Sequence, residues 1–263
     1  MNRIRPAFQK LQSQKKKAII PYITPEFPIS GCTVPLIIGL EKAGADLIEV
    51  GIPFSDPIAD GPTIQRSSQI AIQNGVTLQG VLLSVKQARQ VTKIPIVMMG
   101  YVNPILHYGM EKFLHDARDC GVDGVIVPDF LPEESDEWRR ISLTYGMSTI
   151  FLIAPTTPDE RIRYLDSIST DFTYCVSVTG VTGARTGFGE PDAFEQFLGR
   201  VKKNTTKPFV VGFGISTREH VATIFRHADG AVIGSSLLQR IEKEKNIEGV
   251  VQHASEFLSS LVS

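Results

Sequence analysis

The sequence lacks an excess of charge, a long hydrophobic run and a cysteine set suited to disulfide pairing. Its 27 basic and 28 acidic residues leave a net charge of −1, which gives no sign of a surface for nucleic acid or another polyanion. No apolar stretch approaches the ~20 residues of a membrane span. The opening MNRIRPAFQKLQSQ also lacks the apolar core of a secretory signal. We therefore expect a cytoplasmic protein, or the mature form of a plastid stroma protein, that binds neither nucleic acid nor membrane.

Cysteine, histidine and lysine form no pattern typical of a disulfide framework, a metal site or a Schiff-base site. The cysteines are odd in number and lie in apolar or helical contexts, so they are interpreted as reduced core residues: Cys32, Cys120 and Cys175. The histidines show no H-E-x-x-H spacing, and we predict no metal site. Lys207 is the only lysine on an expected strand and lies at its start, which disfavours a Schiff-base aldolase. The basic run at residues 15–17 is predicted to be a solvated helix end.

Short apolar runs alternate with longer amphipathic runs along the chain. The short runs are predicted as strands at residues 18–23, 46–51, 95–101, 123–127, 148–153, 172–177, 207–212 and 229–233. The longer runs are predicted as helices at residues 30–43, 62–73, 78–91, 111–119, 133–145, 158–167, 191–203, 217–226 and 246–261. Eight β–α repeats with strands buried on both faces favour a parallel sheet, and 263 residues suit an α/β TIM barrel. We expect a single domain over residues 1–263, a (β/α)8 TIM barrel with an extra N-terminal helix. A doubly wound open sheet is the alternative.

The segment DLIEVGIPFSDPIADGPTIQ, residues 46–65, combines a short apolar run with acidic residues. Glu49 lies within the run and shares a face of the expected strand with Leu47 and Gly51. A carboxyl group buried in a strand covered on both faces has a raised pKa, which suits a general acid or base. Asp60 follows in a loop, and two acids in different environments can divide the acid and base roles. A structural ion pair for Glu49 and ordinary Asp-Gly turn chemistry for Asp60 are the alternatives.

Glycine-rich loops follow the seventh and eighth expected strands, at residues 212–216 and from residue 234. Glycine permits close backbone approach, and free N–H groups at a helix start favour an anion. The same two loops, with a short extra helix, form a recurrent phosphate site in barrels. Gly183, after the sixth strand, offers a further donor. The pattern predicts a small phosphorylated substrate, with simple tight turns as the alternative.

Large side chains near the ends of separate strands are candidates to line an apolar slot on the same face of the barrel. Each of them alone is also typical of an ordinary core residue. They are Tyr22, Tyr101, Val127, Ile153 and Tyr174.

Taken together, these motifs resemble the tryptophan synthase alpha subunit family. Besides residues 46–65, matching blocks keep the family's order and approximate spacing at residues 20–24, 101–104, 127–129, 180–183, 212–216 and 234–235. The resemblance implies a TIM barrel and a carbon–carbon lyase. Its reaction is the retro-aldol cleavage of indole-3-glycerol phosphate to indole and glyceraldehyde 3-phosphate. This reaction belongs to the last steps of L-tryptophan biosynthesis, a branch of aromatic amino-acid biosynthesis.

The resemblance also implies roles for single residues. Asp60 accepts the indole N–H, and Glu49 protonates the ring carbon that bears the glycerol chain. Tyr174 approaches the glycerol region, Tyr22 takes the place of an aromatic residue near the ring, and Thr182 lies in a lid at residues 180–187. The phosphate is held by Gly183, Gly212, Phe213, Gly214, Gly234 and Ser235.

The resemblance further implies a partner. Residues 53–60 and the apolar loop at residues 103–109 would face a tryptophan synthase beta subunit in an alpha2-beta2 heterotetramer. Pyridoxal phosphate is expected only in that partner, and no cofactor is expected in this chain.

Several alternatives remain at this point. A different phosphate-binding barrel enzyme would fail to cleave indole-3-glycerol phosphate. A regulatory alpha-like subunit would act only by activating the beta partner. A stand-alone indole-3-glycerol phosphate lyase would release indole without any partner.

Overall fold

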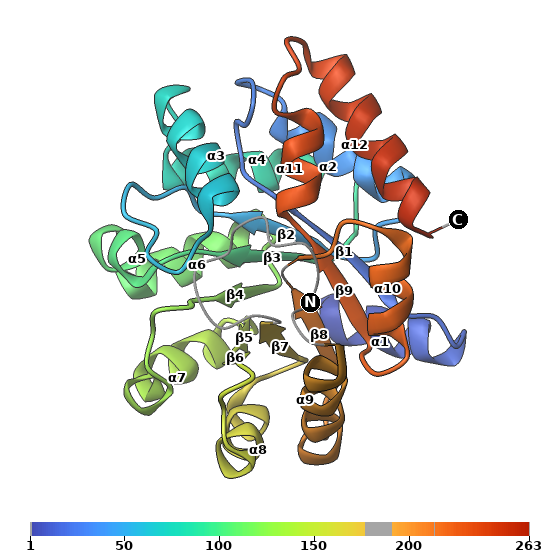
Figure 1. Ribbon diagram of the computed structural model, residues 1–263. Helices are drawn as coiled ribbons and strands as arrows, with labels where there is room; N and C mark the ends of the chain where they lie inside the picture. The colour runs from blue at the N-terminus through green and yellow to red at the C-terminus, as the bar shows by residue number, and fades with distance from the viewer. Residues whose placement is uncertain (1, 177–190, 213, 263) are drawn as a thin grey trace.

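A computed structural model describes residues 2–176, 191–212 and 214–262. Its strands are all parallel to their neighbours and occupy the places predicted from the sequence (Figure 1). They are β1 (Ala18–Ile23), β2 (Ile48–Gly51), β3 (Ile96–Met99), β4 (Gly124–Ile126), β5 (Ser148–Ile150), β6 (Leu152–Ile153), β7 (Thr173–Val176), β8 (Phe209–Gly212) and β9 (Gly230–Ile233). Nearly all of their residues are buried, as expected for strands covered on both faces.

The sheet closes into a barrel where its two end strands, β5 and β6, follow one another along the chain. In the order β5-β4-β3-β2-β1-β9-β8-β7-β6, the two end strands are adjacent in sequence and joined by Phe151 alone. The Phe151 carbonyl accepts a hydrogen bond from the Tyr174 amide at 3.1 Å, and its own amide donates to the Ser169 hydroxyl at 3.1 Å. The expected strand at residues 148–153 is therefore one rung of the barrel, interrupted by one residue. The predicted (β/α)8 TIM barrel is confirmed.

Helices surround the barrel on its outside (Figure 1). They are α1 (Ile4–Ser13), α2 (Thr33–Lys42), α3 (Pro62–Gln73), α4 (Leu78–Ala88), α5 (Val102–Tyr108), α6 (Met110–Cys120), the 3-10 helix η1 (Pro132–Glu134), α7 (Asp136–Thr144), α8 (Asp159–Ile168), α9 (Pro191–Asn204), α10 (Arg218–Phe225), α11 (Ser235–Ile241) and α12 (Ile247–Val262). Within the described residues, no helix is long and apolar enough to cross a membrane.

One segment differs from the sequence prediction. Residues 103–109 were expected to form an apolar loop, and most of them form α5 instead. Pro104 lies in the first turn of this helix, where its missing N–H has no intrahelical partner to lose. Ile105 packs into the core, and Gly109 ends the helix with a positive φ of 93°. With Ile105 as its one buried residue, the helix is too short to show a periodic pattern in the sequence.

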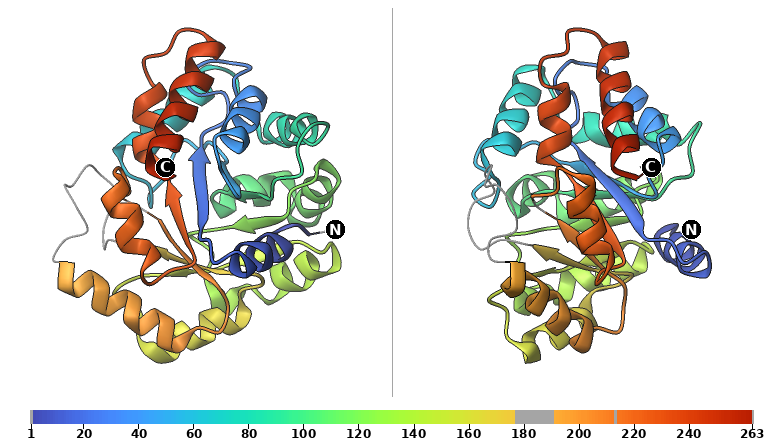
Figure 2. Two further views of the ribbon diagram at one scale, coloured as in Figure 1. Left: turned by 90° about the vertical axis from the view of Figure 1, so that its right-hand side faces the viewer. Right: turned by 45° about the vertical axis from the view of Figure 1, so that its right-hand side comes forward.

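The extra N-terminal helix, α1, lies at the end of the barrel where the strands begin (Figure 2). Ion pairs join the start of the chain to this end of the barrel. Asp123, just before β4, accepts Arg3 and Arg89 side-chain N–H groups at 2.9 Å each, and also the Ile96 amide at 2.9 Å. The Asp123 side chain is fully buried, so its charge is stabilised by these donors.

Candidate active site

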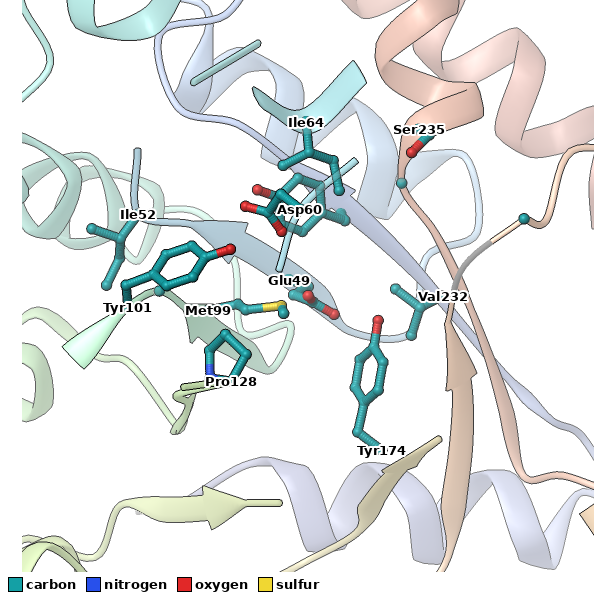
Figure 3. A pocket seen from close by; sticks show the side chains of 14 residues that line it. Glu49, Ile52, Asp60, Ile64, Met99, Tyr101, Pro128, Tyr174, Val232 and Ser235 are labelled. Atoms are coloured by element: carbon teal, nitrogen blue, oxygen red, sulfur yellow. The ribbon is translucent and has the colours of Figure 1, made fainter. Parts of the chain in front are cut away.

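A pocket opens at the carboxyl ends of the strands, inside the barrel (Figure 3). Its lining comes from strand ends and the loops that follow them: Tyr22, Glu49, Ile52, Asp60, Ile64, Met99, Gly100, Tyr101, Pro128, Tyr174, Gly214, Val232, Gly234 and Ser235. The pocket is narrow, with about 30 Å³ free for water-sized molecules. Most of the lining is apolar, and the polar atoms are concentrated on two carboxyl groups and three phenols, the composition of a small-molecule site.

Glu49 is the most deeply buried ionisable group of the pocket. It lies on β2 beside Tyr22 of β1 and Val97 of β3, and aligned residues of parallel strands point to the same face. Its residue is 2% exposed. Burial, and secondarily the charge of Asp60, raises the pKa of Glu49 to about 8. At neutral pH this carboxyl group therefore holds a proton that it can donate.

Asp60 lies in the loop between β2 and α3. Its amide donates to the Pro57 carbonyl at 3.1 Å, and Gly61 then caps the helix that starts at Pro62. Burial raises the pKa of Asp60 to about 6, against the opposite effect of a hydrogen bond from Tyr101. Asp60 is therefore mostly ionised at neutral pH while Glu49 is mostly protonated. The two acids are suited to opposite roles.

Three tyrosines shape the space around the acids. The Tyr101 hydroxyl accepts the Ala59 amide at 3.0 Å, and its ring lies 5.5 Å from that of Phe54, so it anchors the loop that carries Asp60. Burial raises the pKa of the Tyr22 and Tyr174 phenols well above the usual value, and both remain neutral donors.

Tyr22 and Tyr174 each lie against a glycine on a neighbouring strand. A β-carbon on Gly51 would overlap the Tyr22 hydroxyl, and one on Gly212 would overlap the Tyr174 hydroxyl. These strand-end glycines therefore let the tyrosine rings reach into the barrel.

The loops after β8 and β9 meet beside the acid pair. Gly214 has a φ of 77°, in the left-handed region that favours glycine. Gly234 directly precedes α11, which begins at Ser235. The Ser236 hydroxyl donates to the Ile215 carbonyl at 2.6 Å and so joins the two loops. The main-chain N–H groups at the start of α11 lie on the pocket side, where an anion is favoured.

The structure brings most of the sequence-predicted site residues into this one pocket. They are Glu49, Asp60, Tyr22, Tyr101, Tyr174, Gly214, Gly234 and Ser235. Val127, Ile153 and Gly212 are buried at or just beyond their strand ends but do not line it, and the Tyr174 ring lies against Gly212. Thr182, Gly183 and Phe213 lie outside the described residues.

Other lining residues were missed by the sequence reasoning. They are Ile52, Ile64, Met99, Gly100, Pro128 and Val232. All but Ile64 lie within or just after a strand, so the rule that barrel chemistry sits at strand ends points to their region without showing which side chains face the pocket. Ile64, in the first turn of α3, carries no such signal. Among the described residues, no group of three or more His, Cys, Asp or Glu side chains is placed to hold a metal ion.

Comparisons with known proteins match one family over nearly the whole chain. The family described as tryptophan synthase alpha chain matches residues 8–262. The chain is 47% identical over 259 residues to the tryptophan synthase alpha chain of Chlorobium chlorochromatii, covering 96% of this chain and 97% of that protein. It is 44% identical over 258 residues to that of Chlorobium limicola, covering 95% and 97%.

Solved structures match over nearly the whole chain at lower sequence identity. The alpha subunit of tryptophan synthase from Legionella pneumophila matches with a TM-score of 0.90 at 35% identity, over 99% of this chain and 97% of that one. A chain of Mycobacterium tuberculosis tryptophan synthase matches with a TM-score of 0.87 at 33% identity, over 99% and 98%.

Proposed function

This chain belongs to the tryptophan synthase alpha chain family, and on that premise we propose that it cleaves indole-3-glycerol phosphate to indole and glyceraldehyde 3-phosphate. The observation that carries the proposal is the acid pair. A protonated Glu49 and an ionised Asp60 line one pocket, beside loops suited to a phosphate.

The reaction needs a proton on the indole ring and a place for the resulting positive charge. Glu49 donates its proton to the ring carbon that bears the glycerol chain. The ring becomes a cationic indolenine, and the Asp60 carboxylate stabilises its N–H. The bond to the glycerol carbon then breaks, its electrons return to the ring, and the hydroxyl on that carbon gives its proton to the Glu49 carboxylate to form the aldehyde. The proton gained at carbon balances the proton lost from oxygen, so no cofactor of this chain takes part.

The remaining pocket residues bind and orient the substrate. The phosphate is held at Gly214, Gly234 and Ser235, with Gly183, Gly212 and Phe213 as the further contacts expected from the family. The indole ring lies in the apolar part of the pocket, beside Met99 and Tyr101. Tyr22 and Tyr174 offer phenol donors, and Thr182 is assigned to the lid.

A beta subunit is the partner that the family implies, and an alpha2-beta2 heterotetramer is the assembly that we propose. Two apolar side chains support a contact around the mouth of the pocket. Ile58, in the loop before α3, is 76% exposed, and Leu106 on α5 is 52% exposed. Both lie in the segments assigned to the beta contact, and exposed apolar groups of this kind favour protein contacts. Pyridoxal phosphate would belong to that partner.

The test is release of indole from indole-3-glycerol phosphate by the purified chain, with and without a tryptophan synthase beta subunit. We expect slow release alone and strong acceleration by the partner. Fast release that the partner leaves unchanged would indicate a stand-alone lyase. No release under either condition would refute the proposed reaction.

A further inference from the structure

A second cavity, of about 490 Å³, lies at the opposite end of the barrel from the acid pair. Its lining comes from α1 and from the segments just before β1, β8 and β9: Phe8, Leu11, Gln12, Lys15, Lys16, Lys17, Thr206, Lys207, Pro208 and Asp229. Figure 2 shows α1 at this end of the barrel, where the strands begin. Its volume falls within the range of small-molecule sites.

The cavity carries surplus positive charge. Of its four lysines, Lys17 pairs with Asp229 at 2.9 Å, and Lys207 donates to the main-chain carbonyl of Asp166. In the described part of the chain, Lys15 and Lys16 have no carboxylate within ion-pair distance. Lys16 is near enough to Asp46 to lower the pKa of that carboxyl group, but no direct ion pair joins the two among the described residues. The ammonium groups of Lys15 and Lys16 are therefore outside direct ion pairs.

The backbone holds these two lysines in an unusual turn. Lys15 has a φ of 55°, in the left-handed region that glycine favours. Its amide donates to the Gln12 carbonyl at 3.0 Å and the Lys16 amide to the Leu11 carbonyl at 2.9 Å, which ends α1 in a Schellman motif. This turn fixes the backbone at Lys15 and Lys16, whose exposed side chains line the cavity.

One wall of the cavity is apolar. Phe8 and Leu11 are each 7% exposed, and Phe8 packs on Phe172 with ring centroids 5.5 Å apart. Pro208 extends this wall at the start of β8. An anion that fits here has an apolar body as well as a charged group.

We propose that this cavity binds a small organic phosphate monoester. The phosphate lies between Lys15 and Lys16, and the apolar body lies against Phe8 and Leu11. A phosphate monoester near neutral pH carries a charge of about −1.5 to −2, which matches two free ammonium groups, whereas a carboxylate matches one. Lysine binds phosphate as a point charge and needs no bidentate geometry. The site is separate from the pocket of the acid pair and does not depend on the proposed reaction.

The test is an NMR titration of the 15N-labelled full chain with phenyl phosphate, inorganic phosphate and benzoate. The amides at residues 15–17 and 206–207 report on this cavity, and those of Gly214 and Gly234 report on the pocket at the other end. We expect the first set to shift saturably with phenyl phosphate. We also expect its affinity to exceed those for inorganic phosphate and benzoate by at least about tenfold.

Charge-removing variants complete the test. The double variant Lys15→Gln with Lys16→Gln should weaken phenyl phosphate binding, as reported by the first set of amides, by at least about tenfold. The response of the second set of amides and the rate of indole release should not change. Lys93→Gln, which removes an exposed lysine elsewhere, should change neither set. Each of three results would overturn the proposal: no shift in the first set up to about 10 mM phenyl phosphate, equal binding of inorganic phosphate, or unchanged binding by the double variant.

Discussion

The Tyr22 hydroxyl lies directly against the α-carbon of Gly51, in a space that any β-carbon would occupy. Tyr22 is aligned with Glu49 on the next strand, so the position of this ring and that of the buried acid are linked. A glycine two residues beyond Glu49 thus sets how far the tyrosine reaches into the pocket.

Gly51→Ala should therefore displace the Tyr22 ring and lower kcat/KM by about tenfold or more. Adding Tyr22→Phe should restore part of the loss, because it removes the hydroxyl that is overlapped. Steady-state kinetics of indole release would measure both. Gly199→Ala is the matched control, since a β-carbon there meets nothing within 4 Å. Equal kinetics for Gly51→Ala and Gly199→Ala would contradict the prediction.

Glu49→Gln should lower kcat by a factor of about 10³ or more, because the amide cannot donate the proton to the ring. It should also stabilise the fold at pH 7 by roughly 1–3 kcal/mol. The folded chain holds the Glu49 proton up to about pH 8, while the unfolded chain releases it near 4.5. Stability is therefore lost as pH rises through that window, and the amide removes the loss. Urea unfolding at pH 5 and pH 8 would measure it, with exposed Glu134→Gln as the control.

The pH profile of kcat/KM should be bell-shaped. Activity should fall below about pH 6 as Asp60 gains a proton, and above about pH 8 as Glu49 loses its own. The two pKa values that set these limbs are properties of the coupled pair of acids and not of either acid alone. Tyr101→Phe removes a hydrogen bond that lowers the pKa of Asp60, so the acid limb should move to higher pH. An acid limb that stays in place would argue against Asp60 as its source.

Gly234→Asp should raise KM by at least about tenfold through repulsion of the substrate phosphate. The nearest atom to an added β-carbon is the Tyr22 β-carbon at 3.4 Å, so the β-carbon itself fits in ordinary van der Waals contact. Gly234→Asn has nearly the same size and no charge, and should raise KM much less. Equal KM values for the two variants would exclude a charge effect.

Asp123→Asn should destabilise the fold by about 3 kcal/mol. It leaves the guanidinium of Arg89, whose side chain is 9% exposed, without its buried counter-charge. Urea unfolding monitored by the single tryptophan, the buried Trp138, would measure the change. Asp136→Asn, at an ion pair whose carboxylate is 89% exposed, should change stability by less than about 1 kcal/mol.

The barrel could be predicted because its strands are short apolar runs that both faces bury. The interruption at Phe151 could not, since it depends on which neighbour each residue pairs with and not on its hydrophobicity. The helix at residues 102–108 was missed because it is only about two turns long and contains Pro104 in its first turn.

The candidate site likewise contains residues that could be predicted from the sequence and residues that could not. Glu49 and Asp60 stood out because acids are rare beside buried strands, and the glycine loops because of their composition. Met99 and Pro128 were missed because an apolar residue at a strand end looks the same whether it faces a pocket or a helix. Asp123 was predicted only as the first residue of a strand. Its partners, Arg3 and Arg89, are distant in sequence and become visible only when the barrel closes.

The pairing of β1 with β9 has a consequence for how this chain is made. Ala18 aligns with Gly230 and Pro21 with Ile233, so one side of β1 finds its partner only after almost the whole chain has left the ribosome. Until then, β1 is an edge strand with unpaired N–H and C=O groups, the kind of surface that recruits other chains. The nascent protein therefore keeps this open edge until β9 has been synthesised.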